Sequence, residues 1–110
     1  YEGKRYLDFS SQLIYTNLGH QHPRVVQAIK DQADTLCVIQ PSFANDRASE
    51  LGRLLAEISP GDLDMVFFTN GGAEANENAI RLARMHTGRH KIMAAYRSYH
   101  GATHGAISLT

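Results

Sequence analysis

Apolar and polar positions in the first half of the chain alternate with the period of an amphipathic helix. From Pro23, whose fixed φ angle suits the first position of a helix, apolar residues return at three- and four-residue spacing, and charged residues cover the other face. The apolar positions are Val25, Val26, Ile29, Ala33, Leu36 and Cys37. A second helix is predicted from about Asp46 to Ile58, where the Ser-Pro-Gly turn at 59–61 ends it. Its buried positions are expected to be Leu51, Leu54, Leu55 and Ile58.

The second half of the chain places a helical pattern between two short apolar runs. Residues 65–68 form an unbroken apolar run, typical of a strand covered on both faces, and residues 92–96 are the next predicted strand. Between them, residues 73–85 have helical periodicity, and Gly88 is a candidate C-terminal cap. The residues on or beside the apolar face of this helix are Ala75, Ala79, Ile80, Leu82 and Ala83. Strand, glycine turn, helix and strand make a βαβ unit of a parallel sheet, which predicts an α/β fold.

Two extended stretches are predicted ahead of the first helix, at residues 5–10 and 13–16. In the first, Tyr6, Leu7 and Phe9 supply side chains that favour strands. The two stretches are expected to pair as an antiparallel ribbon or an edge element.

Composition narrows the range of partners. The 110 residues carry 11 basic and 11 acidic side chains, so there is no electrostatic reason to expect nucleic acid or an anionic membrane as partner. The single cysteine, Cys37, allows no disulfide within the chain and favours a reducing compartment. No apolar stretch approaches the length of a membrane span, and no signal peptide is visible. Because the sequence starts in mid-pattern at Tyr1 without an initiator Met, we expect it to be part of a longer chain.

The glycine turn before the third predicted helix is a candidate anion site. A helix N-terminus carries unpaired backbone N–H groups and a partial positive charge, and Asn70 is a candidate cap for it. Gly71 and Gly72 have no side chains that would hold an anion away, so a phosphate can approach the backbone up to Ala73. The helix dipole contributes about 0.3–1 kcal/mol to such binding, and up to ~2 kcal/mol in a partly buried site. The alternative is that the glycines only make a sharp turn.

Other phosphate-binding motifs do not fit this turn. A Walker loop requires Lys and Ser or Thr after its glycines, whereas Ala73 and Glu74 follow Gly72. The dinucleotide fingerprint requires separated glycines and a third glycine further on, but here the glycines are adjacent and Ala75 occupies the third position. Glu74 and Glu77, placed in the first helical turn, are expected to complement the helix dipole.

Two pairs of histidines are candidate metal ligands. His100 and His104 have a spacing that binds metals on a helix, but the glycines that follow each of them argue against a helix there. His20 and His22 lie beside Gly19 and Pro23, so they are expected to shape a turn. No second pair of ligands accompanies them, and no metal site is predicted.

The segment after the second predicted strand brings an aromatic ring toward the glycine turn. Ligands of parallel sheets bind beyond the carboxyl ends of the strands, so the strand ends at Phe68 and Tyr96 are expected to face one crevice. Tyr99 follows on a loop, with Gly101 two residues on. A phosphate cradle with a stacking ring suits a phosphorylated aromatic cofactor, and such a stack contributes roughly 0.5–1.5 kcal/mol beyond its buried area. The alternative is that Tyr99 packs on the domain surface.

Three blocks of residues resemble the class III (omega) aminotransferases, which are pyridoxal-phosphate-dependent enzymes of fold type I. The first block is Tyr6-Leu7-Asp8-Phe9, then Asn17-Leu18-Gly19-His20 with His22-Pro23, then Val26 to Ile29. The second, from Phe68 to Glu77, is similar to the phosphate-loop signature of that family. The third is Tyr99-His100-Gly101 with Gly105 to Thr110. Their order and spacing fit over essentially the whole chain, which resembles an N-terminal fragment of such an enzyme.

The resemblance implies the aspartate-aminotransferase-like fold, pyridoxal 5′-phosphate as cofactor, and a homodimer with active sites at the interface. Residues 1–40 would be the N-terminal segment of the small domain, and residues 41–110 the incomplete beginning of the large cofactor-binding domain. The full-length protein would be a cytoplasmic transaminase that moves an amino group from an amine or amino acid to a 2-oxo acid or aldehyde. No nucleic acid or membrane partner is expected.

The resemblance also implies a set of site residues. The cofactor-binding residues would be Gly71, Gly72, Ala73, Tyr99, His100 and Gly101. The amides of Gly72 and Ala73 would hold the phosphate, and the Tyr99 ring would stack on the pyridine ring. A stretch that lines the substrate pocket in the family matches Leu13, Ile14 and Tyr15.

The chain also departs from the family pattern. The family often has Ser or Thr where this chain has Ala73, so the phosphate loses a hydroxyl contact. None of Lys4, Lys30 and Lys91 matches the context of the lysine to which the cofactor attaches, so no catalytic residue is expected within these 110 residues. A decarboxylase, racemase or aminomutase of the same fold shares the cradle and stays open as an alternative, as does a non-enzymatic phosphate-binding module.

Overall fold

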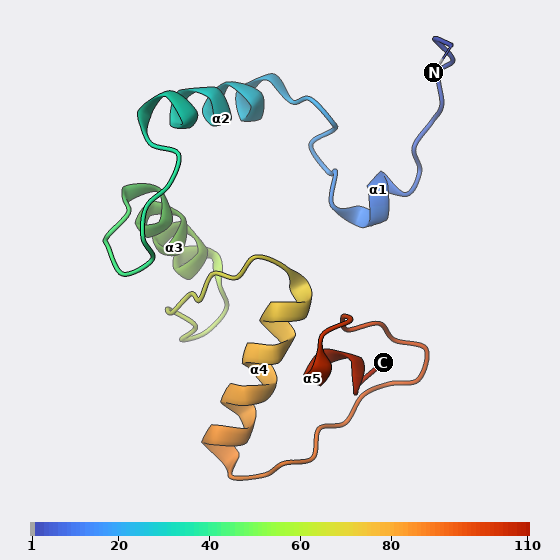
Figure 1. Ribbon diagram of the computed structural model, residues 1–110, viewed down its shortest axis with the longest axis vertical. Helices are drawn as coiled ribbons and strands as arrows, with labels where there is room; N and C mark the ends of the chain where they lie inside the picture. Colours follow the sequence, from blue (N-terminus) through green and yellow to red (C-terminus); the bar gives the residue numbers. More distant parts are fainter. Residues whose placement is uncertain (1) are drawn as a thin grey trace. The chain divides into compact units, whose positions relative to one another are not determined.

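The computed structural model describes residues 2–110, and all the regular elements in this range are helices (Figure 1). In chain order they are α1 (Ser11–Ile14), α2 (Pro23–Thr35), α3 (Asp46–Ile58), α4 (Gly72–Thr87) and α5 (His104–Ile107). The chain divides into two units, Tyr1–Asp46 and Arg47–Thr110. The assignment of residues 1–40 and 41–110 to a small and a large domain stays a prediction.

Helix α2 begins at Pro23, as the sequence predicts, with the extended residue His22 as its N-cap. Leu36 ends the helix in an extended conformation, and its N–H donates to the carbonyl of Gln32 at 2.8 Å. The apolar face that the sequence pattern defines is not covered, because Ile29 is 64% exposed. Local sequence signals therefore fix the helix, while its apolar face is open in this unit.

Helix α3 has the predicted bounds, Asp46–Ile58, but not the predicted burial. Leu54 is 44% and Ile58 78% exposed, so the expected core positions are open in the described residues. The solvent side carries an ion-pair network in which Arg53 bonds Glu50 at 2.7 Å and also contacts Glu57. Hydrogen bonding to Arg53 lowers the pKa of the Glu50 carboxyl below its ordinary value.

Helix α4 covers Gly72–Thr87, one residue earlier and two residues later than the predicted range of 73–85. Its predicted cap is confirmed, because Gly88 adopts the left-handed conformation with φ at 68°. The Gly88 N–H donates to the Arg84 carbonyl at 2.9 Å, which satisfies one of the carbonyls that a helix end leaves unpaired.

The four predicted strands are not formed in residues 2–110, so the strand predictions are not confirmed. A strand exists through backbone hydrogen bonds to a neighbouring strand, and the segments 65–68 and 92–96 do not pair with each other. Their apolar side chains are open as a result, with Met65 90% and Met93 97% exposed. The βαβ unit therefore remains a prediction, although its central helix is formed.

The stretch 13–16, predicted to be extended, instead takes part in a left-handed turn. The φ angles are 46° at Ser11, 51° at Gln12, 64° at Leu13 and 71° at Ile14. Each non-glycine residue in this conformation costs roughly 1–2 kcal/mol, because Cβ crowds the following carbonyl oxygen. The turn closes with backbone bonds to the carbonyls of Ser10 and Ser11, which an extended ribbon could not make.

Candidate cofactor site

The start of α4 presents unpaired backbone donors to open space. Gly71 is the N-cap in an extended conformation, and the Ala75 N–H makes the first helical bond, to the Gly71 carbonyl at 3.0 Å. The amides of Gly72 and Ala73 lie ahead of that bond and have no acceptor inside the helix. A Cβ atom built on Gly71 or Gly72 would meet nothing within 4 Å. The turn therefore fits an anionic group, which can reach these amides without displacing a side chain.

The predicted cap by Asn70 is not formed, because the N-cap is Gly71 and no side chain bonds to the helix start there. Instead Glu74 reaches back, and its Oε2 accepts from the Asn70 N–H at 2.9 Å and from Asn70 Nδ2 at 3.2 Å. Glu74 lies in the first turn, as predicted, where its charge complements the helix dipole. The carboxylate thus fixes the backbone that leads into the glycine turn.

The segment that returns after residue 99 packs directly on the glycine turn. Gly101 is buried with φ at 129°, and a Cβ built on it would lie 2.6 Å from the Cβ of Ala73. Ala106 is fully buried, and α5 lies beside α4 (Figure 1). Two blocks that lie far apart in sequence, Gly71-Gly72-Ala73 and Tyr99-His100-Gly101, are therefore brought together within one unit.

Two polar side chains of α4 bind the returning segment. Asn76 Nδ2 donates to the His100 carbonyl at 2.7 Å. Glu77 Oε1 accepts from the Gly105 N–H at 2.6 Å and from the Ala106 N–H at 3.0 Å. The pKa of the Glu77 carboxyl is lowered below its ordinary value, first by a hydrogen bond from the Thr103 side chain and then by the Ala106 amide.

These two residues correct the sequence-based interpretation. The sequence predicts that Glu77 lies in the first turn and complements the helix dipole. In the structure it lies in the second turn and accepts hydrogen bonds from backbone amides. Together with Ala73 and Ile80, Asn76 and Glu77 lie at helical spacing and form the half-buried to buried face of α4. Polar residues on the packed face of a helix are the signal that could have identified them, because buried polar groups need partners.

The ring of Tyr99 is open, with 76% of the residue exposed, while the next residue is held on both sides. The His100 N–H donates to Thr110 Oγ1 at 3.2 Å, and its carbonyl accepts from Asn76. The backbone next to the ring is therefore fixed, and the ring is free to contact a ligand.

The substrate-pocket residues predicted from the resemblance lie in the other unit. Leu13 is 88%, Ile14 78% and Tyr15 76% exposed. All three follow the left-handed turn of α1 or belong to it, so their backbone is strained or closely constrained. Their part in a pocket stays a prediction.

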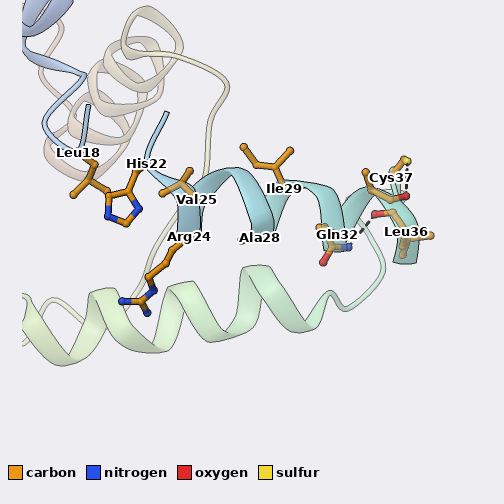
Figure 2. Close-up of a pocket in the computed structure, with 10 residues that line it drawn as sticks. Leu18, His22, Arg24, Val25, Ala28, Ile29, Gln32, Leu36 and Cys37 are labelled. Carbon is orange, nitrogen blue, oxygen red and sulfur yellow. Dashed lines mark hydrogen bonds between the residues drawn. The ribbon is translucent and has the colours of Figure 1, made fainter. Parts of the chain in front are cut away.

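A groove of about 810 Å³ runs along α2 in that same unit. Figure 2 shows Leu18, Val25 and Ile29 along it, with Gln32 bonded to the Leu36 carbonyl. Half of the residues that line the groove are apolar positions that the sequence pattern defined, so the groove includes the open apolar face of the helix. Within residues 2–110, no three His, Cys, Asp or Glu side chains are grouped so as to hold a metal ion. None of the helices in this range is both long and apolar enough to cross a membrane.

Solved structures define the class of protein. The chain superposes on an (S)-enantioselective omega-transaminase from Thermomicrobium roseum with a TM-score of 0.90 and 39% identity, over 99% of this chain and 26% of that one. A phospholyase from Arthrobacter, solved with phosphoethanolamine, gives a TM-score of 0.78 and 38% identity, over 84% of this chain and 22% of that one. The matched residues therefore follow the backbone path of pyridoxal-phosphate enzymes of the aspartate-aminotransferase-like fold.

The sequence then defines the family. The sequence model of the family "Aminotransferase class-III" matches residues 1–110. The chain therefore belongs to this family, whose members depend on pyridoxal phosphate. An acetylornithine aminotransferase of Bacillus cereus is 45% identical over 109 residues, which are 99% of this chain and 28% of that protein. Another from Methanopyrus kandleri is 44% identical, over 99% of this chain and 28% of that protein. The chain thus spans little more than a quarter of the length of these relatives.

Proposed function

We propose that the full-length protein is a transaminase and that residues 71–73 and 99–101 hold its pyridoxal phosphate. The observation that supports this most directly is the packing of Gly101 on Ala73, which puts a fixed loop with an open tyrosine ring beside unpaired helix amides. Membership of the class-III family and the names of the relatives point to the same chemistry. The reaction is transfer of an amino group from an amine or amino acid to a 2-oxo acid or aldehyde.

Each residue has a distinct part in this proposal. The amides of Gly72 and Ala73 donate to phosphate oxygens, assisted by the positive end of α4. The Tyr99 ring lies against the pyridine ring and limits its tilt. When bound, the cofactor supplies an electron sink, and the protein contributes binding and orientation. Because Ala73 has no hydroxyl, phosphate binding depends on backbone N–H donors.

The partners of the full-length protein follow from the same family membership. We propose a homodimer, located in the cytoplasm, in which Leu13, Ile14 and Tyr15 line the substrate pocket. Relatives from several bacteria and archaea are named acetylornithine aminotransferases, so an N-acetylated diamino acid is the first amino donor to assay. A 2-oxo acid is the matching acceptor.

The phosphate role is tested by Gly72→Asp in the full-length protein. A carboxylate at this position fills the open space and repels the phosphate, so cofactor affinity should fall at least about tenfold, which corresponds to about 1.4 kcal/mol. Gly52→Asp is the matched control, because a Cβ on Gly52 also meets nothing within 4 Å and its φ is not positive, but Gly52 lies inside α3. Unchanged affinity in Gly72→Asp, measured by titrating the apoenzyme with cofactor, would refute the phosphate role.

The stacking role is tested by Tyr99→Ala and Tyr99→Phe. Loss of the ring should weaken cofactor binding about two- to thirteenfold, the range that corresponds to a stack of 0.5–1.5 kcal/mol, and shift the absorbance of the bound cofactor. Tyr99→Phe keeps the ring and should retain most of the affinity. If Tyr99→Ala and the wild type have the same cofactor affinity and the same absorbance of the bound cofactor, the stacking role is excluded.

A second candidate is another reaction on the same fold, such as elimination, decarboxylation, racemization or an aminomutase reaction. The specific observation in its favour is the similarity to a phospholyase at a TM-score of 0.78. Consumption of an amine that depends on an added 2-oxo acid would identify a transaminase. Release of inorganic phosphate from phosphoethanolamine without an oxo acid would identify a lyase instead.

A further inference from the structure

Three hydrogen bonds to backbone groups join α4 to the segment that carries Tyr99, and two adjacent residues make all three, while the Thr103 side chain also bonds to Glu77. Asn76 donates to the carbonyl of His100, the residue next to Tyr99. Glu77 accepts from the amides of Gly105 and Ala106, where α5 begins. All three bonds are partly buried, and they join positions 24 to 29 residues apart in sequence. They are therefore tertiary links rather than local surface bonds.

The links leave little freedom to the residues that they hold. A Cβ on Gly105 would overlap the Glu77 carboxylate, so this carboxylate fits closely against the backbone that it binds. On the other side of the loop, Gly101 rests on Ala73 without space for a side chain. The loop is thus held at both ends by α4, through packing at Gly101 and through the carboxylate at Gly105.

The positions along α4 give these links a consequence for the cofactor site. Asn76 and Glu77 lie one turn beyond Gly72 and Ala73 on the same helix, and a helix transmits position rigidly over so short a distance. We propose that Asn76 and Glu77 are positioning residues, which hold the Tyr99 loop in register with the phosphate-binding amides and so set the angle at which the ring meets the cofactor. This proposal rests on the proposed function of the two segments.

The chemistry of the links predicts which substitutions are tolerated. Asn76→Asp keeps the shape of the side chain but replaces the donor with an oxygen, which repels the His100 carbonyl. Glu77→Gln keeps one carbonyl oxygen that can accept from the two amides, so it should retain much of the function. Glu77→Ala removes the acceptor and leaves both amides unpaired.

The first experiment compares these variants as full-length holoenzymes. The readouts are the apparent dissociation constant of pyridoxal phosphate and the visible circular-dichroism band of the bound cofactor, which reports the ring's orientation. Asn76→Asp and Glu77→Ala should weaken binding about two- to tenfold and change the band, while Glu77→Gln should resemble the wild type. Asn78→Ala is the control, because the Asn78 amide bonds within α4, donating to the Glu74 carbonyl and accepting from Arg81, and its loss should leave both readouts unchanged.

A double-mutant cycle tests whether Asn76 acts through the ring. If it does, Asn76→Asp should add little to the loss of affinity already caused by Tyr99→Ala, so the two effects combine non-additively. If Asn76 only supports the fold, Asn76→Asp should lower the melting temperature. It should then weaken cofactor binding by the same factor whether or not the Tyr99 ring is present. Additive effects in this cycle would overturn the positioning role.

The outcomes separate this proposal from the function on which it rests. If Gly72→Asp and Tyr99→Ala both leave cofactor affinity unchanged, the cofactor site itself is wrong. If they weaken binding but Asn76→Asp keeps the wild-type affinity and dichroism band, only the positioning role is overturned. If Asn76→Asp does not fold, the comparison of Glu77→Ala with Glu77→Gln decides, since equal dichroism bands in those two variants contradict the proposal.

Discussion

The backbones of Gly101 and Ala73 touch: a Cβ placed on Gly101 would stand 2.6 Å from the Cβ and 2.9 Å from the Cα of Ala73. Real Cβ atoms do not approach other atoms so closely, so the contact exists only because residue 101 is glycine. The same residue has φ at 129°, a conformation that side chains disfavour. Two independent constraints therefore require glycine where the Tyr99 loop meets the start of α4.

Gly101→Ala should separate the loop from the glycine turn. The overlap and the unfavourable φ together should cost about 1–3 kcal/mol and lower the melting temperature of the full-length apoenzyme. Gly52→Ala is the control, because a Cβ there meets nothing within 4 Å and Gly52 lies inside α3, where Ala is preferred. That control should gain roughly 0.5–1 kcal/mol. Thermal unfolding of both variants checks this, and an unaltered melting temperature for Gly101→Ala contradicts the tight contact.

Local signals in the sequence predicted α2, α3 and α4 well but missed the short helices α1 and α5, the second of which forms although Gly105 argues against a helix there. Pro23 and Gly88 act through their own backbone conformations, so α2 begins at the first and α4 ends before the second, as expected. The strands depend on partners that these segments do not find in each other, and no local pattern reveals where such partners lie. The TM-score of 0.90 to a solved transaminase shows that the backbone path is retained even where no strand is paired.

The packed face of α4 differs in part from the face that the sequence predicts. The sequence predicts a face through Ala75, Ala79, Ile80, Leu82 and Ala83; Ile80 is buried, as predicted, but Leu82 is 58% exposed. Beside Ile80, the face that packs runs through Asn76 and Glu77, which are polar and were not predicted to pack. Hydrophobic periodicity cannot find a face whose contacts are hydrogen bonds to a distant loop, so this part of the site needed the structure.

The left-handed cap of α4 gives a second stability prediction. Gly88→Ala meets no atom within 4 Å but must keep φ near 68°, which costs roughly 1–2 kcal/mol for a residue with a Cβ. Gly88→Asn should cost less, because Asn tolerates this conformation better than Ala. Melting temperatures of the full-length apoenzyme should therefore fall in the order wild type, Asn, Ala. An Ala variant at least as stable as the Asn variant would contradict the left-handed cap.

Glu77 predicts how acid weakens the link between α4 and the loop. Its pKa is held below the ordinary value of 4.5, chiefly by the Thr103 side chain and the Ala106 amide, with a further contribution from the charge of His104. Because the folded pKa is the lower one, the ionised carboxylate stabilises the fold above about pH 4.5, and this stabilisation is lost as pH falls through the folded pKa. Glu77→Gln cannot titrate and lacks this dependence.

The measurement is the difference in melting temperature between the wild type and Glu77→Gln, followed from pH 7 downwards. Other carboxyl groups titrate alike in the two proteins, so their difference isolates Glu77. The difference should be constant near neutral pH and shrink below about pH 4.5. Exchange of the Gly105 and Ala106 amide protons should speed up over the same range in the wild type. If the difference in melting temperature does not vary with pH, the ionised Glu77 carboxylate does not stabilise the fold through these partners.

The left-handed turn of α1 yields a prediction for the segment proposed to line the substrate pocket. Ser11 has φ at 46°, which glycine adopts freely and a β-branched residue strongly resists. Stability should therefore fall in the order Ser11→Gly, wild type, Ser11→Val, and roughly 1–2 kcal/mol or more should separate the two variants. Thermal unfolding of the full-length apoenzyme measures the order. The reversed order, with Ser11→Val the most stable and Ser11→Gly the least stable, would contradict the left-handed turn.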